Sequence, residues 1–147
     1  MKALVKKRSA SILSVGALLT GLLGGAIAAA PSAVAAATYE CNTSKKLPTG
    51  SYYILLPHQN YAPADPYWCY LKYGSSNSGV SALQFTLNKC YGAGLVVDGD
   101  YGPATRSAVV TVQIRLGVSA DGEYGPETRN AMKWSHRTSS GAHHHCA

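Results

Sequence analysis

Apolar residues recur at helical spacing in the second half of the chain. Val80, Leu83, Leu87 and Cys90 lie 3, 4 and 3 residues apart, so they would share one face of a helix. Glycine commonly ends a helix, and Gly92 follows this stripe. The pattern predicts a first helix between residues 78 and 92.

A second helix is predicted to begin at Pro103 and to end at Gly117, because proline at the first helical position loses no hydrogen bond. It has two apolar stripes, one of which contains Val110 and Ile114. The other contains Thr105, Ala108, Val109, Val112 and Leu116. Two apolar faces predict a central helix with neighbours on both sides.

The same start, Gly125-Pro126, predicts a third helix, in which Thr128, Ala131, Met132 and Ser135 share a face. Beyond Arg137 the residues are small, polar or histidine. We expect residues 138–147 to be a solvated C-terminal tail.

Residues 38–76 differ in composition, with several prolines and seven of the ten tyrosines. Ser51–Leu56 is a short apolar and aromatic run that predicts a strand, with Trp68–Tyr73 as its partner in a β-hairpin. The aromatic side chains have two interpretations, a ligand-stacking face or the segment's own core, and we favour the core. We expect this segment to cover Phe85, which lies off the first helical stripe.

Residues 1–37 have the features of a signal peptide. Four basic residues precede a long apolar run, and Ala35-Ala36-Ala37 is a small-x-small cleavage pattern. A retained membrane anchor is the alternative, but glycines and Pro31 interrupt the run. We expect cleavage before Thr38 and a secreted, extracellular or wall-associated protein with no membrane contact afterwards.

Removal of residues 1–37 changes the charge of the protein. The whole chain carries 13 Lys and Arg and 7 acidic residues, and the first 37 residues hold four of the basic residues and none of the acidic ones. The remainder has nine against seven, a net charge of +2. No cluster of Lys and Arg remains in it beyond Lys45-Lys46, so it lacks the basic stripe that nucleic-acid binding requires.

Four cysteines, an even number in an exported small protein, predict two disulfides. Three pairings are open, and we favour Cys41–Cys69 and Cys90–Cys146. No Cys-x-x-Cys is present, so we expect no metal site and no cofactor. The overall prediction is a mainly α fold: a compact three-helix bundle over residues 77–137, preceded by a short disulfide-tied segment with one or two short strands.

A nine-residue motif occurs twice in the helical region. Asp-Gly-Asp-Tyr-Gly-Pro-Ala-Thr-Arg spans residues 98–106, and Asp-Gly-Glu-Tyr-Gly-Pro-Glu-Thr-Arg spans residues 121–129, with seven of nine positions identical. Asp-Gly favours a tight turn, Gly-Pro begins a helix, and threonine can bond into the first turn. We assign these structural roles to Asp98, Gly99, Gly102, Pro103, Thr105, Asp121, Gly122, Gly125, Pro126 and Thr128.

The remaining motif residues are not explained by turn geometry. Tyr101, Arg106, Tyr124 and Arg129 are therefore the candidate ligand-binding residues, with packing at the core edge as the alternative.

Four blocks of residues 77–134 resemble the peptidoglycan-binding domain 1 family, in order and at the expected distances. They are Val80…Leu83-Gln84…Leu87, Val97-Asp98-Gly99-Asp100-Tyr101-Gly102-Pro103, Ala108-Val109…Gln113…Gly117-Val118 and Asp121-Gly122…Gly125-Pro126. The chain departs from the family where Tyr101 replaces phenylalanine, Val112 replaces phenylalanine and Arg129 replaces a frequent tryptophan. The resemblance implies a three-helix bundle that binds the peptide or glycan of the cell wall.

Three functions are consistent with these observations. We favour a secreted non-catalytic peptidoglycan-binding module, because no Gly-x-Ser-x-Gly, His-Glu-x-x-His or paired catalytic carboxylates are present. The alternatives are a trans-acting targeting subunit or inhibitor of a separate wall enzyme, and a small wall hydrolase with an unrecognised site.

Overall fold

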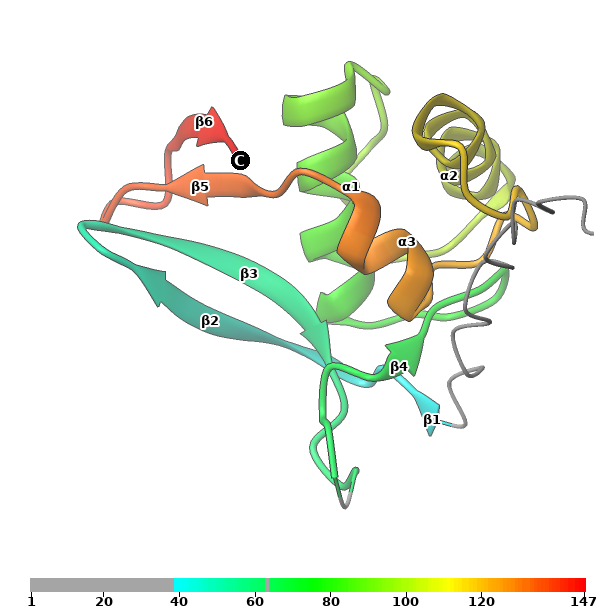
Figure 1. Cartoon of the computed structure of the whole chain (residues 1–147), viewed down its shortest axis with the longest axis horizontal. Coiled ribbons are helices and arrows are strands. Elements are labelled where there is room, and N and C mark those ends of the chain that lie inside the picture. Colours follow the sequence, from blue (N-terminus) through cyan, green and yellow to red (C-terminus); the bar gives the residue numbers. More distant parts are fainter. Residues whose placement is uncertain (1–38, 63) are drawn as a thin grey trace, which may run out of the picture. The chain divides into compact units, whose positions relative to one another are not determined.

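The computed structural model describes residues 39–62 and 64–147 (Figure 1). The expected signal peptide, residues 1–37, lies outside this part of the chain. No helix within the described ranges is long and apolar enough to cross a membrane. The elements, in chain order, are β1 (Tyr39–Glu40), β2 (Thr43–Thr49), β3 (Tyr52–His58), β4 (Cys69–Tyr70), α1 (Ser78–Tyr91), α2 (Pro103–Leu116), α3 (Pro126–Ala131), β5 (Ser135–Arg137) and β6 (His143–Cys146).

The expectation of a mainly α protein is wrong, because the described chain is a mixed α and β fold. A four-stranded antiparallel sheet has the strand order β2-β3-β5-β6, and a two-stranded parallel sheet pairs β1 with β4. The segment expected to be a tail, residues 138–147, contains β6. Together β5 and β6 are two of the four strands of the larger sheet. The short run of histidines in β6 has no apolar alternation, so pairing with β5 rather than local propensity makes it a strand.

The expected hairpin exists with a different partner strand. β3 pairs with β2 through a two-residue turn at Gly50-Ser51, whereas Cys69–Tyr70 pairs with β1. Gly50 has φ 68°, the left-handed backbone that a two-residue hairpin turn requires. The strand Thr43–Thr49 is polar and contains Pro48, which explains why its sequence did not predict it.

α2 begins and ends, and α1 ends, at the residues that the sequence indicated. The third helix is shorter than expected, because α3 ends at Ala131 and Ser135 belongs to β5. Pro103 and Pro126 occupy the first turns of α2 and α3. Gly92 and Gly117 end α1 and α2 in the left-handed conformation. The α1 N-cap is Asn77, whose side-chain oxygen accepts the backbone N–H of Gly79 at 2.8 Å.

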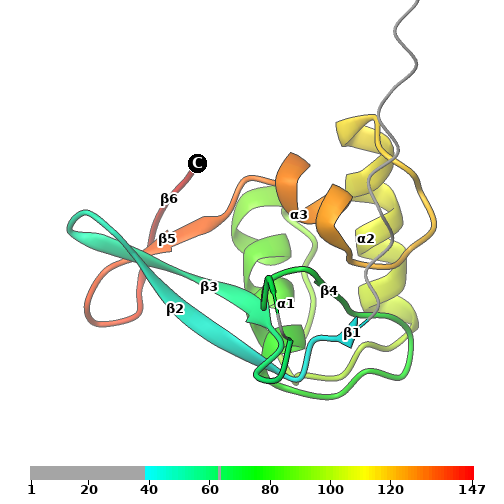
Figure 2. The ribbon, with the colours of Figure 1, turned by 60° about the horizontal axis from the view of Figure 1, so that its bottom comes forward.

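The central helix is α1, which lies between the four-stranded sheet and α2 (Figures 1 and 2). The prediction that residues 103–116 form the central helix is wrong, because Ile114 on its second stripe is 67% exposed. The side chain that lies over Phe85 is Arg137 of β5. The hydrophobic core is formed by Cys41, Leu56, Cys69, Leu71, Val80, Leu83, Leu87, Tyr101, Val109, Val112, Tyr124, Met132 and Trp134.

Two disulfides join segments that are distant in the chain, Cys41–Cys69 and Cys90–Cys146. These are the pairs that we favoured from the sequence. The second joins α1 to β6 and therefore holds the last strand against the helix. A disulfide typically contributes about 2–4 kcal/mol, mainly by restricting the unfolded chain.

Candidate functional site

The first copy of the motif is organised by a buried side chain from α1. Gln84 Nε2 donates toward Asp98 Oδ1 at 2.8 Å, the Asp100 carbonyl oxygen at 3.0 Å and Thr105 Oγ1 at 3.1 Å. Its Oε1 accepts the Gly99 N–H at 2.9 Å. One amide therefore joins the helix, the turn and the first turn of α2.

The second copy has the same arrangement, supplied by Gln113 of α2. Its Nε2 donates toward Asp121 Oδ1 at 2.9 Å, the Glu123 carbonyl oxygen at 2.8 Å and Thr128 Oγ1 at 3.0 Å. Its Oε1 accepts the Gly122 N–H at 2.9 Å. The repeat in the sequence is thus a repeat of one hydrogen-bonded unit.

The role of the two glutamines was missed in the sequence analysis. Both are 1% exposed and lie on the buried side of an amphipathic helix that precedes an Asp-Gly turn. A polar residue directly after an apolar stripe position, as in Leu83-Gln84 and Val112-Gln113, was the available signal. Buried polar groups need partners, and these turns provide them.

The aspartates and glycines of the motif lie in the turns before α2 and α3. The backbone N–H of Asp100 and the amide of Gln84 lower the pKa of the Asp98 carboxyl, which stays ionised at neutral pH. Gly99 has φ 83° and Gly122 has φ 73°. A Cβ on Gly122 would lie 2.9 Å from Arg106 Cγ, so space as well as backbone angle requires glycine.

Tyr101 and Tyr124 are core residues, with exposed fractions of 1% and 0%. The Tyr101 hydroxyl donates to the Gly122 carbonyl at 3.0 Å. The backbone N–H of Tyr101 bonds to Ser75, and that of Tyr124 bonds to Leu71, each at 2.8 Å. Burial raises the pKa of both phenols. The expected role of these two rings as surface ligand contacts does not fit these positions.

The two arginines of the motif bond to the protein itself. Arg106 is exposed, and its Nη2 donates to the Asp121 carbonyl at 3.0 Å, which joins the first motif to the second. Arg129 Nη1 donates to the Tyr67 carbonyl at 2.8 Å and lies 3.9 Å from Asp65 Oδ2. Arg129 therefore fastens the loop before β4 to α3.

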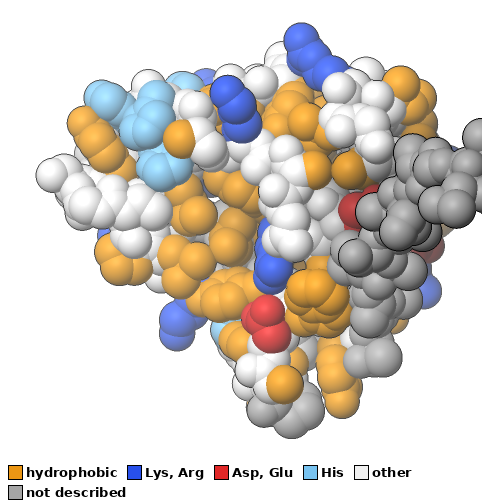
Figure 3. Space-filling view, in the orientation of Figure 1, with side chains coloured by type: hydrophobic (Ala, Val, Ile, Leu, Met, Phe, Trp, Pro, Cys, Tyr) orange, Lys and Arg blue, Asp and Glu red, His pale blue; other side chains and the backbone are white. Residues whose placement is uncertain are grey.

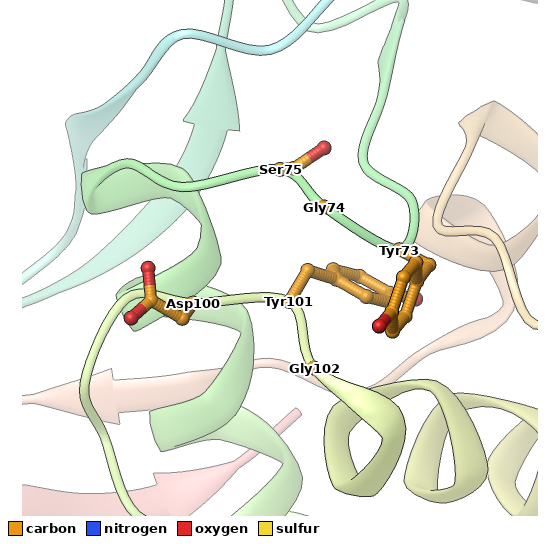
Figure 4. Close-up of a pocket in the computed structure, with 6 residues that line it drawn as sticks. All are labelled: Tyr73, Gly74, Ser75, Asp100, Tyr101 and Gly102. Atoms are coloured by element: carbon orange, nitrogen blue, oxygen red, sulfur yellow. The ribbon is translucent and has the colours of Figure 1, made fainter.

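A shallow surface pocket lies where the chain before α1 meets the first motif (Figure 4). Its volume is about 260 Å³, and the backbones on its two sides pair through Gly74 N–H to the Tyr101 carbonyl at 3.1 Å. The rings of Tyr73 and Tyr101 lie at one end, and the carboxylate of Asp100 lies at the other (Figure 4). The lining residues are Tyr73, Gly74, Ser75, Asp100, Tyr101 and Gly102.

Tyr73 is the exposed aromatic side chain of this pocket, with 63% of its surface accessible. In the sequence, Tyr73 is one of the seven tyrosines of residues 38–76, and no motif there distinguishes it from the others. Its place beside the first motif follows from the pairing of residues 74–76 with residues 99–101, which no local pattern indicates.

Histidine rings of β5 and β6 contact one another and Tyr52. The rings of His136 and His145 stack with centroids 4.4 Å apart, and His144 stacks on Tyr52 at 4.2 Å. Nδ1 of His144 lies 2.7 Å from Nδ1 of His145. In residues 39–62 and 64–147, no three His, Cys, Asp or Glu side chains are arranged to hold a metal ion.

Comparison with known proteins assigns the helical region. Residues 76–132 match the family model described as "Putative peptidoglycan binding domain". No curated protein matches the chain.

Two solved structures show local similarity. A fused Zn-dependent amidase/peptidase/peptidoglycan-binding domain-containing protein from Clostridium acetobutylicum is 38% identical, with a TM-score of 0.40, over 42% of this chain and 27% of that one. A peptidoglycan-binding protein from Clostridioides difficile, in complex with glutamine hydroxamate, is 26% identical, with a TM-score of 0.45, over 59% of this chain and 54% of that one. The present chain thus spans about a quarter and about half of their lengths.

The family match covers α1, α2, α3 and both motif copies, and it confirms the resemblance found in the sequence. Residues 76–132 are therefore similar to the putative peptidoglycan-binding domain over the region that holds the three helices.

Proposed function

We propose that this protein is a non-catalytic module that binds peptidoglycan. The observation that carries the proposal is the family match over residues 76–132, which coincides with the two glutamine-centred units. Hydrogen bonds within these units hold the turns rigid before any ligand arrives. Such preorganisation reduces the entropy lost on binding.

The pocket beside Tyr73 is the surface we assign to the ligand. An exposed tyrosine offers an apolar ring face and a hydroxyl, which suits the ring of a sugar or an apolar peptide group. Gly74 and Gly102 expose backbone because they have no side chain, and Asp100 can accept hydrogen bonds from hydroxyl or amide groups. Tyr73 takes the role that we first gave to Tyr101 and Tyr124.

The carboxylates of the motif support binding rather than catalysis. Oδ1 of Asp98 and Oδ1 of Asp121 each accept a glutamine N–H and a backbone N–H, so one oxygen of each carboxylate is occupied by the fold. Glycoside hydrolysis commonly needs two carboxyl groups across one bond. Among the described residues that line the pocket, Asp100 is the single carboxylate.

We place the protein outside the cell or at the cell wall. Two disulfides are typical of proteins in an oxidising compartment. The signal-peptide pattern of residues 1–37 supports export followed by removal of that segment.

Sedimentation with insoluble peptidoglycan tests the proposal. The purified protein should leave the supernatant with the wall material. Tyr73→Ala should weaken binding roughly tenfold, as expected for an aromatic contact worth about 1–2 kcal/mol. Tyr61→Ala is the matched control, because Tyr61 is 85% exposed and lies outside the pocket.

A protein that stays in the supernatant would contradict wall binding, and equal losses in the two variants would contradict the assignment of the pocket. Release of soluble fragments from dye-labelled wall measures hydrolysis. We expect no release above the buffer blank, and steady release by the protein would replace the binding proposal with an enzymatic one.

A further inference from the structure

Acidic residues are absent from three described segments that the fold brings together. Residues 43–58, 78–91 and 133–147 contain five Lys and Arg, all five histidines and no Asp or Glu. They form β2, β3, α1, β5 and β6, which pack against one another. On the face shown in Figure 3, histidines gather where β5 and β6 lie, and the red acidic side chains are elsewhere.

Within this region, basic side chains lie over aromatic rings. Lys46 Nζ is 3.9 Å from the ring centroid of Tyr53. Arg137 Cζ is 3.6 Å from the ring centroid of Phe85, and Lys89 Nζ is 5.7 Å from the same centroid. Tyr53 and Arg137 are partners across β3 and β5, so the five residues are continuous. We call them the cationic ledge.

The positive charges of the ledge are not neutralised by the described protein. Lys89 and Arg137 share one ring, and among the residues that the structure describes the single ion pair is Arg129–Asp65, outside the ledge. Arg137 Nε is buried and has no hydrogen-bond partner in the described chain.

Positively charged side chains that are held close together favour the binding of an anion that contacts more than one of them. Arginine presents several donors in a planar fork that matches carboxylate and phosphate oxygens, and lysine adds a point charge. Lys46 and Lys89 are exposed, so an anion can reach them from solvent. The side chains are already ordered on the rings, which lowers the entropic cost of binding.

We propose that the cationic ledge is a second binding site, for the phosphate or carboxylate groups of an anionic wall polymer. The site involves no residue of the Tyr73 pocket. Phosphodiesters of a polymer and free carboxylates of stem peptides share this oxyanion chemistry, so the experiment compares the two.

Titration of inorganic tripolyphosphate and of citrate into the purified protein at low salt, about 50 mM, tests this site. Both anions should bind, and the stronger of the two identifies the preferred oxyanion. Lys89→Gln should weaken binding roughly fivefold, the size of one lost charge contact of about 1 kcal/mol. Arg115→Gln on α2 removes the same charge outside the ledge and should leave the affinity unchanged.

His143 supplies an independent readout. Burial lowers the pKa of His143, and Lys89, His145, His144 and Arg137 lower it further. A bound anion would offset these positive charges, so the imidazole pKa measured by NMR should rise when tripolyphosphate is added. Arg137→Lys keeps the positive charge but loses the planar donor fork, so it should bind tripolyphosphate more weakly than the unaltered protein.

Two results would overturn the site: no binding of either anion at low salt, or equal affinity for Lys89→Gln and Arg115→Gln. Tyr73→Ala should bind tripolyphosphate with unchanged affinity. The proposal of an anion site at the cationic ledge and the proposal of a peptidoglycan site at the Tyr73 pocket can therefore be refuted independently.

Discussion

Gln84 and Gln113 make equivalent hydrogen bonds from different helices. Each amide nitrogen bonds to the aspartate of the following motif, at 2.8 Å in the first copy and 2.9 Å in the second, and each amide oxygen accepts the next glycine N–H at 2.9 Å. The structural repeat therefore includes a residue from the helix before each turn. Both glutamine amides are buried, and these bonds give each of them hydrogen-bond partners.

Replacing either glutamine with glutamate should destabilise the protein strongly. In Gln84→Glu, the donor that faces the Asp98 carboxylate becomes a second acceptor, and the buried charge has no cation beside it. We expect a loss of about 3 kcal/mol or more in the free energy of unfolding, measured with urea. Gln113→Glu should behave in the same way.

The control for these variants is Asn130→Asp, which makes the same chemical change on the exposed surface of α3 and keeps the acceptor for Arg129 Nε. It should change stability by less than about 0.5 kcal/mol. A similar small effect in Gln84→Glu would show that the network contributes little.

The two motif tyrosines should respond differently to loss of the hydroxyl. Tyr101→Phe leaves the Gly122 carbonyl without its donor, so the free energy of unfolding should fall by about 1–2 kcal/mol. The Tyr124 hydroxyl is buried without a partner in the described chain, so Tyr124→Phe should be neutral or stabilising. Thermal unfolding of the two variants side by side measures the difference, and the opposite order would refute the assignment.

The disulfide Cys90–Cys146 should be necessary for the last strand. Joint replacement of both cysteines by serine removes the link between α1 and β6, and we expect a loss of about 2–4 kcal/mol. Amide hydrogen exchange should show faster exchange in residues 143–146 than in α1, because β6 lies at the edge of the sheet. Unchanged protection of β6 would show that strand pairing alone is sufficient.

Stability should decrease as the pH falls below the usual histidine range. The pKa values of His58, His136 and His143 are lowered in the folded protein, in each case mainly by burial. The unfolded chain therefore binds more protons in the window from the unperturbed pKa, about 6.5, down to the folded values. The histidine contribution is complete above that window and is lost as the pH falls through it.

Urea unfolding at steps from about pH 8 to about pH 5 measures this dependence. His136→Gln should give a flatter profile over the same range. The lowered pKa of Asp98 acts only at lower pH, because carboxyl groups titrate near 4. A profile unchanged by His136→Gln would assign the dependence to other groups.

Much of the helical domain could be predicted from the sequence. Its turns and helix ends depend on the backbone angles of neighbouring residues. The turns are Asp98-Gly99 and Asp121-Gly122, the helix starts are Pro103 and Pro126, and the helix ends are Gly92 and Gly117. Those angles are properties of glycine and proline themselves.

The candidate site was harder to predict. Tyr101 and Tyr124 follow glycine-rich turns, where a side chain is usually exposed, and residues 71–75 fold over them. The position of Tyr73 beside the first motif and the assembly of the cationic ledge likewise depend on contacts between segments far apart in the chain. No local pattern contains that information.

The sequence by itself determined the repeat, the family resemblance of residues 76–132 and the local geometry of each turn. Only the tertiary structure decided that Ser135–Arg137 and His143–Cys146 are strands, that Gln84 and Gln113 hold the turns, and that the motif tyrosines are buried. The physical reason is the range of the interactions. A turn is specified by adjacent backbone angles, whereas a strand such as β5 requires a partner such as β3, about 80 residues earlier in the chain.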